Sequence, residues 1–400
     1  MPWERRDFKK YLAQTSPEPL MFEPVRGKGV YLYDKNDRPY LDLISGISVS
    51  ALGHGNPSVI GAIEEQLHRY MHTMVYGEFV LSPQVLLAKK VMQTLPPDLD
   101  NIYLVNSGSE AVEGAIKLAF KYTGRRGLVA CKNAYHGSST GALSLMSDEY
   151  YSEGYKPLLS GVQYIEFNSV ESLSVISETT AAVFVETLQG EAGYITAETE
   201  FMQALADRCR EVGCLLVLDE IQAGMGRTGT FWAFEQFGIV PDILLTAKGF
   251  GGGLPLGAFI SRKEIMQVIS DGPILGHITT FGGNPVSCAA ATATISQILD
   301  GDLAKEVAAK EALFRSELAA VGLLEISGRG LMLGVKIGDF EDAKKMVQSC
   351  LKRGLLIDWF LYDTGKLRIC PPLTISREEI IVACTTIGEA WNETLENKKR

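Results

Sequence analysis

Two stretches, residues 214–220 (CLLVLDE) and 242–253 (DILLTAKGFGGG), decide the fold of this 400-residue chain. Each contains an unbroken apolar run that ends in a polar side chain, Asp219 in the first and Lys248 in the second. A short run that is apolar throughout is typical of a strand buried on both faces, as in a parallel sheet covered by helices. The 29 positions from Asp219 to Lys248 leave room for one helical connection between neighbouring parallel strands.

Short apolar runs of the same kind, separated by amphipathic helices, are found along the chain before these stretches. Further short apolar strands are predicted at 102–106, 128–131, 162–167 and 182–186, with helices at 109–121 and 199–212. Strands that alternate with amphipathic helices indicate a parallel sheet with helices on both faces. We therefore expect an α/β fold with a mostly parallel central sheet.

The pattern of predicted helices and strands changes after about residue 295. Helices are predicted at 303–320 and 341–353, and short strands at 331–337 and 366–370, which is typical of a smaller α+β unit. Near the N-terminus, residues 29–33 and 39–43 form an apparent hairpin around a turn at 34–38. We expect residues 1–45 to belong to the small domain, 46–295 to form the large domain and 296–400 to complete the small one. The sequence pattern alone does not decide which domain the hairpin belongs to. Its assignment to the small domain rests partly on the resemblance described below.

Composition and charge exclude several classes of protein. A net charge of −10 argues against nucleic-acid binding, which normally needs a basic face. No apolar run approaches the roughly 20 residues that cross a bilayer, so no membrane association is expected. The seven cysteines are scattered without a CxxC pair, and the five histidines have no metal-ligand spacing. Buried free thiols in a cytoplasmic protein without a metal are therefore predicted.

Polar motifs follow three of the other predicted strands. They are 106–110 (NSGSE), 133–139 (NAYHGSS) and 186–191 (ETLQGE). Ligands of a parallel sheet collect at the carboxyl ends of its strands, so these motifs are candidates for a shared site. Taken singly, each has a plain alternative: a serine that caps a helix, a half-buried loop aromatic, and solvated carboxylates.

Asp219 and Lys248 are the most informative of these strand ends. A buried carboxylate such as Asp219 needs a partner, either a structural arginine or a protonated ring nitrogen. A lysine at the end of an apolar strand, beside a glycine-rich loop, tends to lose its proton or to be neutralised covalently. Together with a helix N-terminus for an anion and an aromatic ring for stacking, they supply the parts for pyridoxal phosphate chemistry.

These residues, in this order, resemble the class III (ornithine-type) aminotransferases among the fold type I pyridoxal phosphate enzymes. The resemblance covers nearly the whole chain and is strongest in LDEIQAGMGRTGTF (218–231) and PDILLTAKGFGGGLPLGA (241–258). Further matching motifs are NSGSEA (106–111), AYHG (134–137), VETLQGEAG (185–193), TFGGNPVSCAA (280–290) and LRICPPL (367–373). The resemblance implies an aminotransferase of the acetylornithine, ornithine or 4-aminobutyrate type that uses pyridoxal 5'-phosphate.

The resemblance also implies roles for residues around that cofactor. Lys248 would form a Schiff base and move the proton of the substrate carbon, while Asp219 would keep the ring nitrogen protonated. The reaction would move the terminal amino group of an ω-amino acid or amine to 2-oxoglutarate by a ping-pong route. Among the residues around the cofactor, Gln222 would donate a hydrogen bond to its phenolic oxygen, and Tyr135 and Ile221 would lie on the two faces of its ring. The implied cofactor-binding residues are Gly108, Ser109, Tyr135, His136, Glu186, Asp219, Ile221, Gln222, Lys248 and Thr280.

Three further implications concern the partner subunit and the substrate. Thr280 resembles a phosphate ligand that this family supplies across a subunit interface, which implies a homodimer. Arg368 would bind the α-carboxylate of glutamate or 2-oxoglutarate, and Glu191 would neutralise Arg368 when an amine without that carboxylate binds.

Two departures from the family pattern leave the amino donor open. Ser138 stands where many relatives have an arginine for the distal carboxylate of the substrate, and residues 53–57 read GHGNP instead of Gly-His-x-His-Pro. Another cation, or a donor without that carboxylate, would explain the serine. An aminomutase or racemase on the same fold, or a non-catalytic cofactor-binding protein, are the alternative functions.

Overall fold

Seven strands form the central sheet of the computed structural model, which describes residues 3–399. Their order across the sheet is β4-β12-β11-β10-β7-β5-β6. Their bounds are β4 (Asn101–Val105), β5 (Gly127–Cys131), β6 (Val162–Ile165), β7 (Thr180–Glu186), β10 (Leu215–Asp219), β11 (Ile243–Thr246) and β12 (Gly257–Ser261). Residues 214–220 and 242–253 thus contain the neighbouring central strands β10 and β11, which pair in parallel.

The sheet is mostly parallel, which confirms the predicted fold class. The exception is β12, which runs antiparallel to both β11 and β4. Sequence reasoning did not predict this strand. Ten residues, 247–256, separate β11 from β12, and a connection of this length suits an antiparallel neighbour, whereas a parallel crossover needs a dozen or more residues.

Helices cover the sheet because their buried faces consist of small and apolar side chains. Helix α5 (Gly108–Thr123) is capped by Ser107, whose hydroxyl accepts a hydrogen bond from the Glu110 N–H. Ala111, Ala115 and Ala119 are fully buried along its inner face, so the helix approaches the sheet closely. The other large helices on this side of the molecule are α3 (Pro57–Arg69), α4 (Ser82–Met92), α8 (Thr199–Val212) and α10 (Pro285–Asp300).

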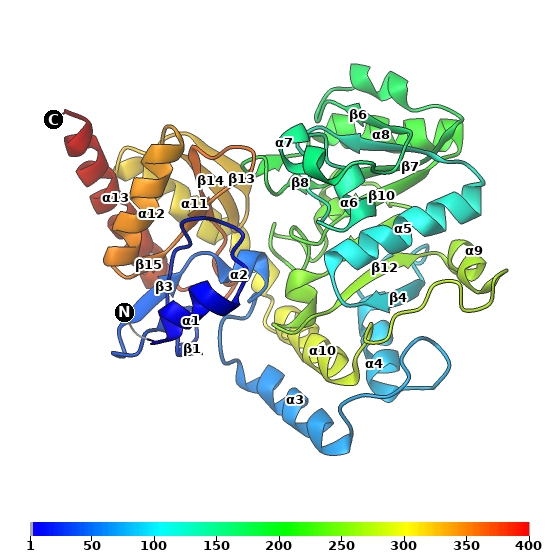
Figure 1. Cartoon of the computed structure of the whole chain (residues 1–400), viewed down its shortest axis with the longest axis horizontal. Coiled ribbons are helices and arrows are strands. Elements are labelled where there is room, and N and C mark those ends of the chain that lie inside the picture. The colour runs from blue at the N-terminus through cyan, green and yellow to red at the C-terminus, as the bar shows by residue number, and fades with distance from the viewer. Residues whose placement is uncertain (1–2, 400) are drawn as a thin grey trace.

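The two ends of the chain share a smaller unit beside the large sheet (Figure 1). Its first sheet joins β1 (Arg26–Lys28), β2 (Tyr31–Tyr33) and β3 (Pro39–Asp42) to β15 (Leu355–Leu356). Its second sheet has the order β13-β14-β17-β16, with β13 (Ile326–Arg329), β14 (Met332–Lys336), β17 (Lys366–Ile369) and β16 (Asp358–Trp359). Three helices complete it: α11 (Leu303–Ala320), α12 (Phe340–Lys352) and α13 (Arg377–Lys399).

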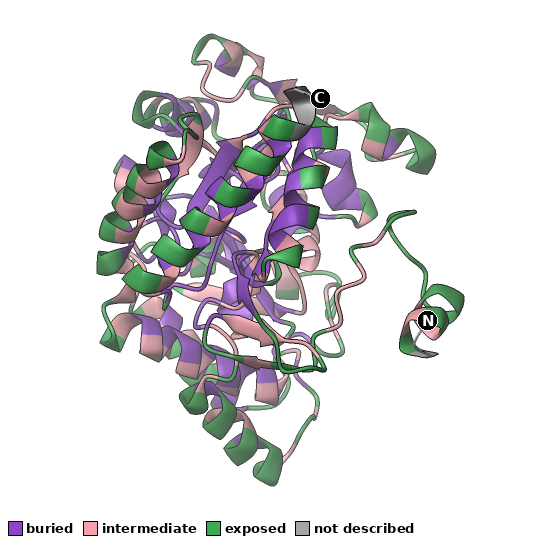
Figure 2. Ribbon diagram, turned by 90° about the vertical axis from the view of Figure 1, so that its left-hand side faces the viewer, coloured by how far each residue is buried: buried purple, intermediate pink, exposed green. Residues whose placement is uncertain are grey.

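Burial follows this arrangement. Figure 2 shows the sheets and the inner faces of the helices buried, while helix α1 (Trp3–Tyr11) stands away from the rest of the chain. All seven cysteines are buried free thiols. Among residues 3–399, no helix is both long enough and apolar enough to cross a membrane.

Candidate functional site

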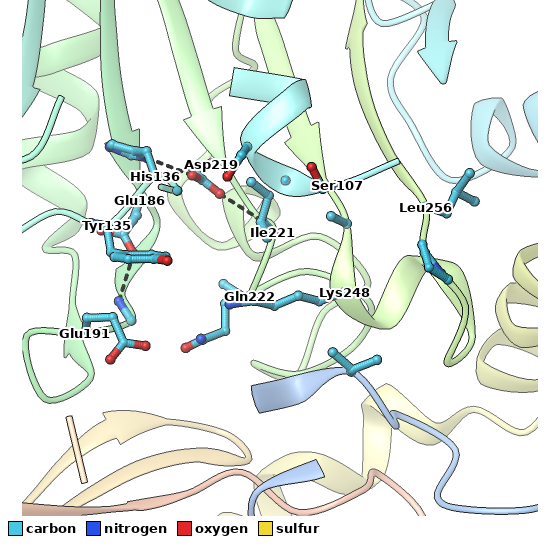
Figure 3. A pocket seen from close by; sticks show the side chains of 18 of the residues that line it. Ser107, Tyr135, His136, Glu186, Glu191, Asp219, Ile221, Gln222, Lys248 and Leu256 are labelled. Carbon is cyan, nitrogen blue, oxygen red and sulfur yellow. Dashed lines mark hydrogen bonds and ion pairs between the residues drawn. The ribbon is translucent and has the colours of Figure 1, made fainter. Parts of the chain in front are cut away.

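A cavity of about 420 Å³ lies at the carboxyl ends of the parallel strands (Figure 3). The strand-end motifs that were separate in the sequence converge on it, because the ends of parallel strands share one edge of the sheet. Ten of the residues named from the sequence line it: Gly108, Ser109, Tyr135, His136, Glu186, Glu191, Asp219, Ile221, Gln222 and Lys248.

Lys248 directly follows the loop end of β11 and has a left-handed backbone, with φ of +49°. Such a conformation is unfavourable for a residue with a side chain and is found most often at functional sites. Among the described residues its ammonium group has no hydrogen bond or ion pair, and burial lowers its pKa below the ordinary 10.5, although the charge of Glu191 acts in the opposite direction. At a given pH more of such a lysine is neutral than of an exposed one, so it is more readily available as a nucleophile and proton acceptor.

Asp219 ends β10 and is 5% exposed. One carboxylate oxygen lies 2.7 Å from Nδ1 of the fully buried His136, and the other accepts a hydrogen bond of 3.0 Å from the Ile221 N–H. Burial lowers the pKa of His136, but the hydrogen bond and charge of Asp219 raise it by more. The two contacts fix the Asp219 carboxyl group at the floor of the cavity, with the imidazole of His136 behind it.

Glu186 ends the neighbouring strand β7 and supports the same wall of the cavity. It accepts hydrogen bonds from the backbone N–H groups of Tyr135 (3.2 Å) and Gly190 (2.9 Å). Burial raises the pKa of Glu186 to about 7, because its charged form has lost most of its water. Its contact with Tyr135 fixes the backbone that carries this ring at the cavity.

The first turn of α5 offers a place for an anion. Its first residues, Gly108 and Ser109, line the cavity, and the helix is 16 residues long, so its backbone N–H groups and dipole favour negative charge. A Cβ at Gly108 would lie 2.8 Å from Ile221 Cδ1, so a larger residue here would force the Ile221 side chain to move. Gly137, with φ of +131°, brings the next loop against the Ser109 side chain.

Two buried polar atoms at the cavity have no hydrogen-bond partner within the described residues: Gln222 Oε1 and His136 Nε2. Unpaired buried polar groups are costly and indicate a ligand or an ordered water. The combination of an anion site, an aromatic wall, a buried carboxylate and a lysine with lowered pKa fits a planar, phosphate-bearing aldehyde such as the predicted pyridoxal phosphate.

Arg368 does not line the cavity directly but reaches it through Glu191. The guanidinium donates from Nη1 to Glu191 Oε1 (2.9 Å) and from Nη2 to Oε2 (2.7 Å), which is a bidentate ion pair. Arg368 is 2% exposed and Glu191 is 6% exposed. Burial alone would raise the pKa of Glu191, but the charge and hydrogen bonds of Arg368 lower it below its ordinary value. Both groups therefore stay charged at neutral pH.

Two residues predicted from the sequence lie at the edge of this arrangement or outside it. Thr280 is exposed on the loop before α10 and does not reach the cavity of its own chain. The hydroxyl of Ser138 lies 3.2 Å from the Tyr135 hydroxyl, so this position supplies a neutral polar group.

Sequence reasoning missed several apolar residues that line the cavity: Val49, Leu188, Leu254 and Leu256. Val49 follows a turn, Ser45–Ser48, in which all four residues have left-handed φ between 51° and 64°. Three of these four residues are not glycines, and such a turn has no signature in composition or periodicity. The position of Leu254 and Leu256, directly after the glycines that follow Lys248, was a usable signal.

Comparisons with known proteins agree with this geometry. The sequence model of the family described as Aminotransferase class-III matches residues 11–391. The acetylornithine aminotransferase of Archaeoglobus fulgidus is 38% identical over 381 residues, which is 95% of this chain and 98% of that protein. The LysW-aminoadipate semialdehyde/glutamate semialdehyde transaminase of Sulfurisphaera tokodaii is 40% identical, covering 78% of this chain and 81% of its own. The solved ornithine aminotransferase of Toxoplasma gondii superposes with a TM-score of 0.91 at 29% identity, over 100% of this chain and 96% of that one.

Proposed function

Because the chain belongs to the class-III aminotransferase family and is a pyridoxal phosphate-dependent transaminase, we propose that it moves the terminal amino group of an ω-amino acid or amine to 2-oxoglutarate. The observation that carries this proposal is the bidentate Arg368–Glu191 ion pair beside the cavity of Lys248. The same guanidinium fork matches the carboxylate of a keto acid, so one site serves both substrates of a ping-pong reaction.

The proposed chemistry assigns one task to each buried group. When bound, pyridoxal phosphate supplies an electron sink for the electron pair that remains when the substrate carbon loses its proton. Lys248 carries the cofactor covalently and moves that proton at Nζ, for which its lowered pKa suits it. Asp219, held by His136 and the Ile221 N–H, stabilises a proton on the ring nitrogen.

Glu191 and Arg368 adapt the site to two kinds of substrate. With a donor that has no carboxylate near the reacting amine, Glu191 keeps Arg368 neutralised. With 2-oxoglutarate or glutamate, the substrate carboxylate replaces Glu191 on the guanidinium. The exchange keeps a carboxylate on the buried arginine at both stages, and this is necessary because an unpaired buried charge costs several kcal/mol.

The donor is best identified with a screen of the first half-reaction. Acetylornithine, ornithine, 4-aminobutyrate, lysine and diamines are each mixed with the holoenzyme, and the visible absorbance of the cofactor is followed until it returns on addition of 2-oxoglutarate. Apolar side chains such as Leu188 and Leu256 line the cavity, and the exposed Ser138 supplies a neutral hydroxyl beside that of Tyr135 in place of a cation, which favours donors without a distal carboxylate. Turnover of an amine without any keto acid would instead indicate an aminomutase or racemase.

We expect Arg368→Ala to lower kcat/KM for 2-oxoglutarate by about 100-fold or more while sparing simple amines, since it removes two charge-assisted hydrogen bonds to the keto acid. The measurement is the rate of each half-reaction in turn. The substitution also leaves Glu191 buried without its partner, at a cost of about 3–5 kcal/mol in stability. Arg368→Lys keeps the charge but not the fork, and it should show the same selective loss in a stable protein. Equal loss of both half-reactions in Arg368→Lys would contradict the switch.

The lowered pKa of Lys248 gives the attachment of the cofactor a specific pH dependence. Only the neutral amine attacks the aldehyde, so the rate of reconstitution of the apoenzyme should rise with pH and reach its midpoint below 10.5. Because the charge of Glu191 raises the pKa of Lys248, Glu191→Gln should move the midpoint to still lower pH. Absorbance after rapid mixing with pyridoxal phosphate measures both profiles. A wild-type midpoint at or above 10.5, or a shift to higher pH in the variant, would show that burial does not control this lysine.

We further propose that the chain works as a homodimer in which Thr280 completes the phosphate site of the partner subunit. Support comes from the apolar side chains exposed around it, among them Ile278 (51%) and Phe281 (57%). The loop at 281–284 contacts the segment around Met71, which is also exposed, through the Asn284 side chain and the Met71 carbonyl. A contiguous apolar surface of this kind is typical of a protein interface.

Thr280→Ala should weaken cofactor affinity by about 10- to 100-fold, the usual effect of losing one hydrogen bond to a charged group. The exposed Thr385→Ala on α13 is the matched control and should have no effect. Mixed dimers of Thr280→Ala with Lys248→Ala subunits decide where Thr280 acts. If it acts across the interface, each mixed dimer regains one site with full cofactor affinity; if it acts within its own chain, no site is restored.

A further inference from the structure

Arg368 faces a second carboxylate that none of its proposed roles uses. Asp358 on β16 is the direct cross-strand neighbour of Arg368 on β17, so both side chains project from the same face of the sheet. Asp358 Oδ1 lies 3.3 Å from Arg368 Nε. Glu191 occupies the other edge of the guanidinium, the fork of Nη1 and Nη2. The guanidinium of Arg368 is therefore contacted by Asp358 at Nε and by Glu191 at Nη1 and Nη2.

The contact between Asp358 and Arg368 is an ion pair without a hydrogen bond. Arg368 Nε and Asp358 Oδ1 are both buried and neither has a hydrogen-bond partner within the described residues, although the two atoms lie only 3.3 Å apart. Buried polar groups normally form their hydrogen bonds. The bond is left unmade while Glu191 holds the fork, and a small rotation of the guanidinium would complete it.

The short segment that follows Asp358 touches both members of the Arg368–Glu191 pair. The Trp359 carbonyl accepts a hydrogen bond of 3.3 Å from Arg368 Nη2. The Leu361 N–H donates to Glu191 Oε2 at 3.3 Å. One stretch of five residues, 358–362, thus provides contacts for the arginine that stays in place and for the glutamate that has to leave.

We propose that Asp358 is a positioning residue for the keto-acid half-reaction: it holds Arg368 through Nε while Glu191 is exchanged for the substrate carboxylate. When Glu191 leaves the Nη1/Nη2 fork, Asp358 is the one carboxylate among the described residues that still contacts the guanidinium, at Nε. Without Asp358, the guanidinium would have no carboxylate partner at that stage. The fork would then no longer be fixed toward the cavity, and bidentate recognition depends on that orientation. The inference rests on the proposed exchange of Glu191 for a substrate carboxylate.

The test compares two substitutions that have the same number of side-chain heavy atoms and the same branching as aspartate. Asp358→Asn retains an oxygen that accepts a hydrogen bond from Nε, and it removes only the charge. Asp358→Leu removes the acceptor and keeps water out of its place. Asp363→Asn, on the loop between β16 and β17, is the matched control because Asp363 pairs with Lys336 and Lys366 and not with Arg368. Each half-reaction is followed separately in the holoenzyme, with the preferred amine and with 2-oxoglutarate.

We expect Asp358→Leu to raise KM for 2-oxoglutarate by about 10-fold, the equivalent of one charge-assisted hydrogen bond. The amine half-reaction should stay within about 2-fold of wild type, because Glu191 then remains on the fork. Asp358→Asn and Asp363→Asn should keep KM for 2-oxoglutarate within about 2-fold. If the leucine variant does not fold, Asp358→Ala removes the same acceptor without a bulky apolar group and has the same expected outcome.

An unchanged KM for 2-oxoglutarate in the variants without the acceptor would overturn the proposal. So would an equal rise in Asp358→Asn, or an equal loss of both half-reactions, which indicates a general structural role. These outcomes leave the proposed function intact, since the wild type still turns over. If the wild type itself does not consume 2-oxoglutarate after reacting with an amine, the proposed function fails and this inference fails with it.

Discussion

Lys248→Ala is expected to reduce transamination by about 10⁴-fold or more, because in the proposed function Lys248 both carries the cofactor covalently and moves the substrate proton. No neighbour can replace it. Among the described residues that line the cavity, Lys248 is the only lysine or arginine. The protein should fold normally, since the ammonium group has no hydrogen bond or ion pair whose loss would leave a partner unpaired, and the measurement is turnover of the preferred amine with 2-oxoglutarate.

Lys132→Ala is the matched control for this experiment. Lys132 directly follows strand β5, near the same edge of the sheet, but its side chain is half exposed and pairs with Glu166. Its loss should leave turnover unchanged, because an exposed ion pair contributes little. A Lys248→Ala enzyme that still transaminates at more than about a hundredth of the wild-type rate would contradict the assignment of both tasks to this residue.

Asp219→Asn is expected to lower kcat by about 10³-fold and to change KM for the amine little, because in the proposed function the carboxylate acts on charge that develops during the reaction and does not contact the substrate. The asparagine has the same shape. It keeps an oxygen for the Ile221 N–H, and the imidazole of His136 can exchange its tautomer to face the amide, so the loss should be electrostatic and not structural. Steady-state kinetics and the melting temperature of the holoenzyme together measure this.

Asp242→Asn serves as the control for the second prediction. Asp242 lies just before β11, at the opposite end of the sheet from the cavity, and pairs with Arg262. It should leave kcat unchanged even where it lowers stability. A fall in kcat for Asp219→Asn that tracks its loss of thermal stability would show that the carboxylate supports the fold instead of the reaction.

Much of this site could be predicted from the sequence because its residues directly follow strands whose apolar sequences are easily recognised. The runs that end in Asp219 and Lys248 are apolar throughout, and parallel strands leave their carboxyl ends at one edge. Helix α8 (Thr199–Val212) begins and ends where its periodicity predicts. The local pattern was sufficient for these two strands, in which burial on both faces imposes a largely apolar run.

The rest depended on contacts between distant segments. Strand β12 is apolar and buried, but it was missed because the expected alternation of strand and helix left no place for a second strand so soon after β11. Asp358 was missed because a single carboxylate in the apolar run 355–360 has a meaning only when its cross-strand partner, Arg368, is known. Val49 enters the cavity through a left-handed turn at 45–48, which propensities do not predict.

The sheet that joins both ends of the chain affects how the protein is made. Leu41 on β3 pairs in parallel with Leu355 on β15, so strands made among the first residues find their neighbour only when synthesis is almost complete. At about 5–20 residues per second, that delay of about 300 residues is about 15–60 seconds. During this time β3 has an unpaired edge and the apolar side chains of Leu41 and Leu43 lack their final cover. The N-terminal strands therefore stay without this partner strand until nearly the whole chain has been made.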